Sequence, residues 1–155
     1  MRSIDQWLQE YGESHQNPTN KLIHWFCVPL IVLSVIGLFW SIPVPEAMSN
    51  ISPWLNFGTL LILLALIYYT FLSIKLSIGM LLYSALTVLV IQWLNGLELA
   101  LWKSSLGIFV VAWIVQFIGH EIEGKKPSFL KDIQFLMIGP IWLLSFLYKK
   151  AGIKI

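Results

Sequence analysis

The chain has 155 residues, of which 57% are hydrophobic and only 12% are charged, and its formal net charge is +2. A soluble domain contains roughly 25% charged residues, and one of this length leaves much of its surface in water. The composition therefore excludes a soluble domain. It predicts an all-α integral membrane protein, folded as a single membrane-embedded helical domain over residues 1–155. The small net charge and the lack of a basic stripe exclude a nucleic-acid partner.

The N-terminal segment, residues 3–15, alternates polar and apolar groups at helical spacing. Its apolar side consists of Ile4, Trp7, Leu8 and Tyr11. This pattern predicts a short amphipathic helix that lies on the membrane surface. Asn17-Pro18 then ends that helix and begins the next one, because asparagine suits the N-cap and proline suits the first helical position.

Four apolar segments follow, at about residues 22–41, 54–74, 77–94 and 100–119. Each approaches the ~20 residues that are needed to cross ~30 Å of hydrocarbon. Short connections separate them, so we expect four transmembrane helices. A last apolar stretch, about residues 133–148, is shorter and contains Gly139-Pro140. It predicts a kinked C-terminal helix that does not complete a crossing, with five crossings as the alternative.

The distribution of lysine and arginine favours four crossings. Four crossings place nine of the ten lysine and arginine residues on one face, with only Lys103 opposite, whereas five crossings divide them six to four. Because cytoplasmic loops carry the excess of positive charge, both termini are expected in the cytoplasm. The membrane would be the inner membrane of a bacterium or the endoplasmic reticulum of a eukaryote. The start of the first crossing and the end of the fourth would then share the cytoplasmic face.

The three histidines of the chain all lie at this predicted face. His15 and His24 flank the start of the first apolar segment, and His120 closes the fourth. The break at Asn17-Pro18 lets the segment with His15 fold back over His24, and Glu123 shares a helix face with His120. Imidazole together with carboxylate suits iron, zinc or manganese. The pattern therefore predicts a metal site at the cytoplasmic mouth of the helix bundle.

Several polar side chains near the histidines are candidates to orient the imidazoles. These are the amides of Asn17 and Asn20 and the carboxylate of Asp132. The alternative interpretation is that each histidine is an interfacial anchor and that the two asparagines only cap a helix. Cys27 is the single cysteine, so no disulfide can form within the chain. Its thiol lies in an apolar helix, where it stays protonated and inert, so nucleophilic catalysis is not expected.

Two motifs carry a resemblance to a known family. The first is His15-x-Asn17-Pro18-x-Asn20-x-x-Ile23-His24-x-x-x-Val28-Pro29, and the second is Trp113-x-x-Gln116-Phe117-x-Gly119-His120, followed by Glu123 and Pro127. In this order, and with comparable hydrophobic segments between them, they resemble the 2-hydroxy-fatty-acid dioxygenases. These are small endoplasmic-reticulum proteins of fungal phytosphingosine breakdown, with many bacterial relatives. The similarity covers nearly the whole chain.

The resemblance implies Fe(II)-dependent α-oxidation, in which a 2-hydroxy fatty acid and dioxygen give a fatty acid one carbon shorter and carbon dioxide. A 2-hydroxy acid offers its carboxylate and hydroxyl oxygens to such an ion. By the resemblance, His15, His24 and His120 hold the iron and Glu123 is the accompanying acidic residue. The eukaryotic members carry their glutamate one residue further from the histidine, so Glu121 remains an alternative.

The resemblance and the residues together assign the remaining roles. Glu123, Asn17 and Asn20 are the candidate catalytic groups around the metal. Lys125 and Lys126 would attract the substrate carboxylate, while the acyl chain would lie in an apolar groove between helices. The alternative function is a non-catalytic one: a small membrane protein that binds lipid or assembles with a partner.

Overall fold

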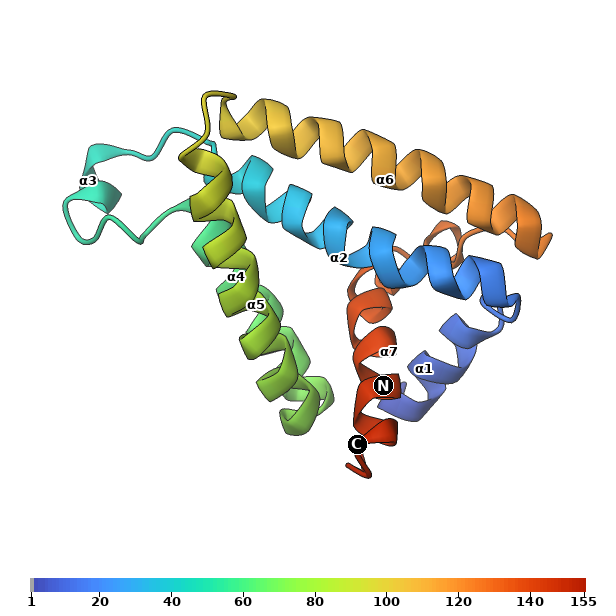
Figure 1. Cartoon of the computed structure of the whole chain (residues 1–155). Coiled ribbons are helices and arrows are strands. Elements are labelled where there is room, and N and C mark those ends of the chain that lie inside the picture. Colours follow the sequence, from blue (N-terminus) through green and yellow to red (C-terminus); the bar gives the residue numbers. More distant parts are fainter. Residues whose placement is uncertain (1) are drawn as a thin grey trace.

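In a computed structural model that describes residues 2–155, the chain forms seven α-helices and one short 3-10 helix, with no strand among these residues (Figure 1). The helices are α1 (Ile4–Gly12), α2 (Pro18–Trp40), α3 (Glu46–Ser49), α4 (Phe57–Leu72), α5 (Ile74–Asn95), α6 (Leu101–Glu123), η1 (Ser128–Leu130) and α7 (Phe135–Lys150). The predicted all-helical architecture is confirmed. The short elements α3 and η1 lie in connections that the sequence pattern did not predict to be helical.

Three helices are long and apolar enough to cross a membrane. They are α2, α5 and α6, with mean hydropathies of 2.4, 2.0 and 1.7. Helix α4 is equally apolar in character but has 16 residues, fewer than the ~20 of a typical crossing. A membrane protein is therefore supported, while the number of crossings stays a prediction.

Helix α1 is the expected amphipathic helix, and its apolar face contacts protein. Ser3 caps it, since its side chain accepts a hydrogen bond from Gln6 N and the Gln6 side chain accepts one from Ser3 N. Trp7 and Tyr11 are buried against α7, where the Trp7 ring meets the edge of Phe135 at 5.1 Å between centroids. The predicted apolar side of this helix thus forms part of the core together with α7, so it is not the side that a membrane surface would contact.

Helices α2 and α6 run antiparallel and form the most extensive helix pair (Figure 1). Small residues let the two backbones approach closely, as is common between membrane helices. Gly37, near the end of α2, lies against Ser105 and Leu101 at the start of α6. At the other end of the pair, Gly119 lies against Asn20 and Ile23. This antiparallel arrangement brings the start of α2 beside the end of α6.

Helix α7 packs among the other helices instead of lying apart from them. It contacts α1, α2 and α5, and Ile138 and Ile141 are fully buried. Two hydrogen bonds tie it to the α4–α5 hairpin: the Tyr69 hydroxyl donates to Met137 O at 2.9 Å, and the Tyr148 hydroxyl donates to Lys75 O at 2.6 Å. The helix includes Pro140. It therefore connects the region of η1 with the start of α5.

Replacing Gly37 with leucine should lower the melting temperature of the detergent-solubilised protein by roughly 2–10 °C, because overpacking a filled interface destabilises a protein by about 1–3 kcal/mol. Any side chain at Gly37 meets Ser105. The matched control is Gly107→Leu in α6, since a Cβ atom there has no neighbour within 4 Å. Tryptophan fluorescence would report both transitions. Equal losses in the two variants would contradict the close approach of α2 and α6.

Candidate metal centre

Three histidines from separate segments meet at the end of the α2–α6 pair. His15 lies in the turn between α1 and α2, His24 in the second turn of α2, and His120 near the end of α6. One nitrogen from each ring lies within 4.8 Å of the other two. The exposed fractions of the three residues are 1%, 1% and 6%. The cluster is therefore buried as well as compact.

Backbone carbonyls fix the orientation of two of the rings. His15 Nδ1 lies 2.6 Å from Tyr11 O, and His24 Nδ1 lies 2.9 Å from Asn20 O. A carbonyl only accepts, so each Nδ1 carries the proton and each Nε2 presents a lone pair. The two Nε2 atoms face one another at 3.0 Å. Two lone pairs at this distance repel unless a proton or a cation lies between them.

The electrostatic surroundings favour neutral imidazole. The pKa of His15 is lowered to about 4, mainly by burial and also by the nearby His120, while the hydrogen bond to the Tyr11 carbonyl opposes the shift. At neutral pH the ring is therefore uncharged. Neutral imidazole is the form that binds a metal ion. A ring nitrogen tied to a backbone carbonyl is also the usual second partner of a metal-binding histidine.

The turn between α1 and α2 positions His15 over His24. Asn17 is the N-cap of α2, and its side-chain oxygen accepts a hydrogen bond from Thr19 N at 2.9 Å. Pro18 occupies the first helical position. The cap ends α1 and reverses the chain, so residues nine apart in sequence face one another. The Asn17-Pro18 break therefore acts as the sequence pattern predicted.

Glu123 ties the end of α6 to this turn. Its carboxylate accepts hydrogen bonds from Gln16 N and Asn17 N, both at 2.8 Å, and from Asn20 Nδ2 at 3.2 Å. These three donors occupy the carboxylate oxygens of Glu123. Glu123 therefore lies outside the cluster of ring nitrogens and supports the histidines through its hydrogen bonds to the turn and to Asn20. Glu121 is exposed.

Asn20 joins three parts of the site. Its carbonyl accepts from His24, while its side-chain amide donates to Glu123 and to Ser14 O at 3.2 Å. Gly119 leaves room for it, because a Cβ atom there would lie 2.5 Å from Asn20 Oδ1. The structure thus places both predicted asparagines beside the histidines, one as the helix cap and one within the hydrogen-bond network.

The predicted lysines lie on the outer side of His120. Together with His120 and Phe117, Lys125 and Lys126 line an outer hollow of about 390 Å³. Lys125 Nζ donates to Glu13 O at 2.7 Å. Asp132 does not reach the histidines, because it pairs with Arg2 at 3.1 Å. The expectation that Asp132 orients an imidazole is therefore wrong.

Two aromatic residues that the sequence did not single out for the site cover His15. The Tyr11 ring stacks on the imidazole at 4.2 Å between centroids, and the Trp142 ring lies at 5.2 Å. Tyr11 had been assigned only to an apolar helix face, and Trp142 comes from α7, far away in the sequence. Only the packing of α1 against α7 brings them here. They exclude water from one side of the cluster.

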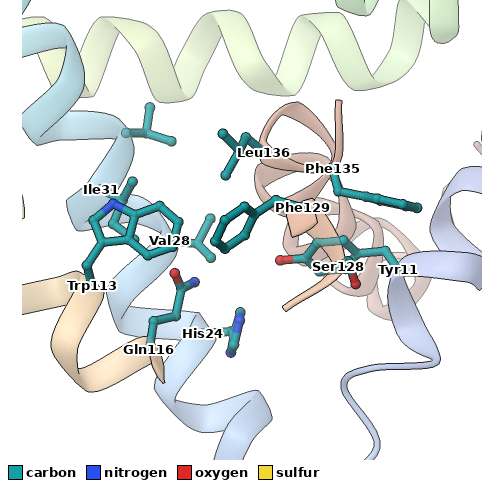
Figure 2. Close-up of a pocket in the computed structure, with 12 residues that line it drawn as sticks. Tyr11, His24, Val28, Ile31, Trp113, Gln116, Ser128, Phe129, Phe135 and Leu136 are labelled. Atoms are coloured by element: carbon teal, nitrogen blue, oxygen red, sulfur yellow. The ribbon is translucent and has the colours of Figure 1, made fainter. Parts of the chain in front are cut away.

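A small inner cavity of about 50 Å³ adjoins the cluster, with His24 and Tyr11 in its wall (Figure 2). Gln116 of α6 lies beside His24, Trp113 lines the cavity one turn away on the same helix, and Ser128 and Phe129 close it from η1 (Figure 2). Gln116 and Trp113 belong to the second sequence motif, but spacing alone gave them no role. A compact set of neutral nitrogen donors with an adjoining cavity can hold a divalent ion and leave space for a small ligand.

Comparison with known proteins agrees with the resemblance seen in the motifs. Residues 1–151 match the family described as 2-hydroxy-palmitic acid dioxygenase Mpo1-like. The chain is also 29% identical, over 142 residues, to the 2-hydroxy-palmitic acid dioxygenase MPO1 of Saccharomyces cerevisiae. That alignment covers 90% of this chain and 76% of the yeast protein. No solved structure matches the chain. The chain therefore belongs to the Mpo1-like family.

Replacing Glu123 with glutamine should weaken metal binding by roughly 10–100-fold, the range seen when a partner that orients metal ligands is lost. A neutral amide has one acceptor oxygen, whereas the carboxylate accepts from three donors. Titration with Co(II), followed by its visible absorption, would measure the affinity. Glu121→Gln is the matched control and should leave the affinity unchanged. A larger effect at Glu121 would assign the carboxylate role to that residue instead.

Proposed function

We propose that this member of the Mpo1-like family is a membrane-embedded non-haem Fe(II) dioxygenase that shortens 2-hydroxy fatty acids by one carbon. One molecule of acid and one of dioxygen give the shorter acid, carbon dioxide and water, so that all atoms balance. The observation that carries the proposal is the buried cluster of three histidines, two of which point unprotonated nitrogens at one another. The name of the yeast relative supports the substrate class.

The residues fit a divalent ion. His15, His24 and His120 would hold it, because their ring nitrogens converge and their burial favours the neutral form. When bound, Fe(II) supplies the redox chemistry that activates dioxygen and holds the reactants as a template. Glu123 and Asn20 keep the rings in place through the hydrogen bonds described above. Asn17 preserves the turn by capping α2.

Positive charge near the outer hollow supports capture of an anionic substrate. Lys125 and Lys126 lie beside His120, at the face where the lipid surface would meet the cytoplasm. Their positive charge would raise the concentration of the substrate carboxylate near the site. The two lysines would not contact the substrate during the reaction. Tyr11 and Trp142 would keep bulk water from the far side of His15.

The membrane arrangement that we propose has four crossings, with both termini in the cytoplasm. The membrane would be the inner membrane of a bacterium or the endoplasmic reticulum of a eukaryotic cell. Contacts among residues expected on one face support this arrangement. Lys75 Nζ, at the start of α5, donates to Lys154 O at 2.6 Å, and Lys125 reaches Glu13. Helix α7 runs between the end of α6 and the start of α5, both on the same predicted face. A helix with both ends at one face does not complete a crossing.

Replacing His15, His24 or His120 with alanine should reduce bound iron to near zero and abolish oxygen-dependent shortening of 2-hydroxypalmitic acid. Elemental analysis after anaerobic loading measures the iron, and mass spectrometry measures the shortened acid. Cys27→Ala is the control and should keep both, because no role is proposed for this thiol. A wild-type protein that stays folded, binds no metal and leaves 2-hydroxy acids intact would support the non-catalytic, lipid-binding alternative.

Replacing Lys125 and Lys126 together with glutamine should raise the KM for the hydroxy acid by roughly 2–10-fold and change kcat little, because ground-state attraction affects capture more than turnover. Added salt should shrink the difference from wild type, since exposed charges are screened. The control is Lys103→Gln, at the opposite predicted face. A fall in kcat with an unchanged KM would assign the two lysines a part in the chemical step.

A further inference from the structure

The inner cavity beside His24 contains polar atoms without hydrogen-bond partners. Trp113 Nε1 and Ser128 Oγ are buried and make no hydrogen bond with residues 2–155. Both residues line the cavity, as does Gln116 (Figure 2). An unpaired buried polar group destabilises the fold, so such groups usually face a ligand or ordered water. Three neutral hydrogen-bonding groups therefore surround a space next to a predicted metal ligand.

A second, larger space lies along a neighbouring face of α2. It is a groove of about 470 Å³ between α2, α5 and α7. Almost all of its wall is apolar: Trp25 and Pro29 come from α2, Met80 from α5, and Leu143 and Leu147 from α7. The two tyrosine hydroxyls near it are already bound, since Tyr83 donates to Pro29 O and Tyr148 donates to Lys75 O. This groove can therefore make apolar contacts with a hydrocarbon chain, and it has few hydrogen-bonding groups for a polar ligand.

The cavity and the groove adjoin at one residue. Val28 lines both spaces, and it is buried in the core. On the α7 side, Gly139 lines the inner cavity and the next residue, Pro140, lines the groove. The contact between α2 and α7 therefore borders the partly polar inner cavity on one side and the apolar groove on the other. The inner cavity lies beside His24, and the groove opens toward the side where Leu82 and Leu147 are exposed.

We propose that the substrate occupies both spaces, with its carboxylate and hydroxyl group in the inner cavity and its acyl chain in the groove. Val28 is the residue at which the chain leaves the cavity. Trp113, Gln116 and Ser128 are positioning residues that donate hydrogen bonds to the oxygen-bearing head. This assignment rests on the proposed function, because it places that reaction's substrate at the same histidine site.

The chemistry of the two spaces matches the two halves of a 2-hydroxy fatty acid. Neutral N–H and O–H donors in a buried cavity bind a carboxylate without introducing another charge near the metal ligands. The acyl chain moves between the bilayer and the groove, which are both apolar, so the groove selects by shape more than by hydrophobicity. A chain that must fit a walled groove is therefore sensitive to bulk added there, whereas a short acid held only by its head is not.

Filling the groove tests the position of the chain. Leu147→Trp should raise the KM for 2-hydroxypalmitic acid by about tenfold, within the range that overpacking a site produces, and leave the KM for 2-hydroxybutyric acid unchanged. Leu63→Trp is the matched control, because Leu63 and Leu147 are exposed to the same degree, 53% and 51%, and Leu63 does not line the groove. An equal change for both acids, or for both variants, would overturn the proposal.

A direct measurement uses the wild-type protein and needs no turnover. 2-Hydroxypalmitic acid with a diazirine at its last carbon should label residues 79–83 of α5 and 143–150 of α7 after irradiation, and unlabelled 2-hydroxypalmitic acid should suppress this labelling. Labelling confined to α4 or to the lipid side of α6 would overturn the proposal. Labelling of the groove that the unlabelled hydroxy acid does not suppress would show that the probe enters the groove only as a bilayer lipid does. This result would also overturn the proposal.

The head is tested by removing one hydrogen-bond donor. Trp113→Phe keeps the aromatic packing against Phe129 and removes only the N–H group. It should raise the KM for both acids roughly tenfold with the melting temperature unchanged, whereas Trp54→Phe, at an exposed tryptophan, should not. An unchanged KM in Trp113→Phe would overturn the assignment of the head.

These measurements separate the two hypotheses. If the protein shortens 2-hydroxy acids but Leu147→Trp affects long and short acids alike, the proposed function stands and the groove is not the site of the acyl chain. If the hydroxy acid suppresses labelling of the groove but the protein shortens no hydroxy acid, the groove binds the acyl chain and the proposed reaction is wrong.

Discussion

The carboxylate of Glu123 makes the interaction on which the site depends. It accepts hydrogen bonds from two backbone amides of the turn and from the Asn20 side chain, and so joins the end of α6 to the start of α2. Hydrogen bonds to a charged acceptor are roughly twice as strong as neutral ones. Without this connection, the turn that carries His15 would be held to α6 by little more than the Lys125 contact. Together with the packing of Gly119 against Asn20, this connection holds His120 beside the other two histidines.

A second constraint follows from burying three imidazoles in so apolar a chain. Burial disfavours the charged ring, and the carbonyls of Tyr11 and Asn20 hold the proton on Nδ1 of the two rings that they contact. The remaining nitrogens then face one another with their lone pairs. This arrangement is unfavourable by itself and favourable around a cation. The same burial that excludes water therefore also keeps the rings in the neutral form that can hold a metal ion.

The position of α7 links the site to the membrane part of the molecule. This helix carries Trp142 against His15 and also forms one wall of the apolar groove. Gly139 lets Tyr11 and Val28 approach its backbone, since a Cβ atom there would lie 2.9 Å from the Tyr11 hydroxyl. Helix α7 is shorter than a typical membrane span and contains Gly139 and Pro140. Its composition is explained by its packing inside the protein. Its small and proline residues fit between α1, α2 and α5.

The sequence alone determined the helical class, the break at Asn17-Pro18 and the family. Apolar periodicity and length fix where helices form in lipid, because every backbone group there must bond within its own segment. Charge asymmetry placed the three histidines at one predicted face, but it could not say how closely they approach. The spacing of Glu123 after His120 likewise left open whether it binds the metal or supports its ligands.

The tertiary structure decided the rest. The hydrogen bonds of Glu123 depend on a backbone turn more than a hundred residues away in sequence, and no local pattern encodes them. Asp132 was misassigned for the same reason: its partner is Arg2, at the other end of the chain. The inner cavity, the groove and the aromatic cover over His15 all arise where α7 packs between helices that precede it by many residues. Local sequence sets which segments become helices, whereas side-chain packing between distant segments sets which residues surround the histidines.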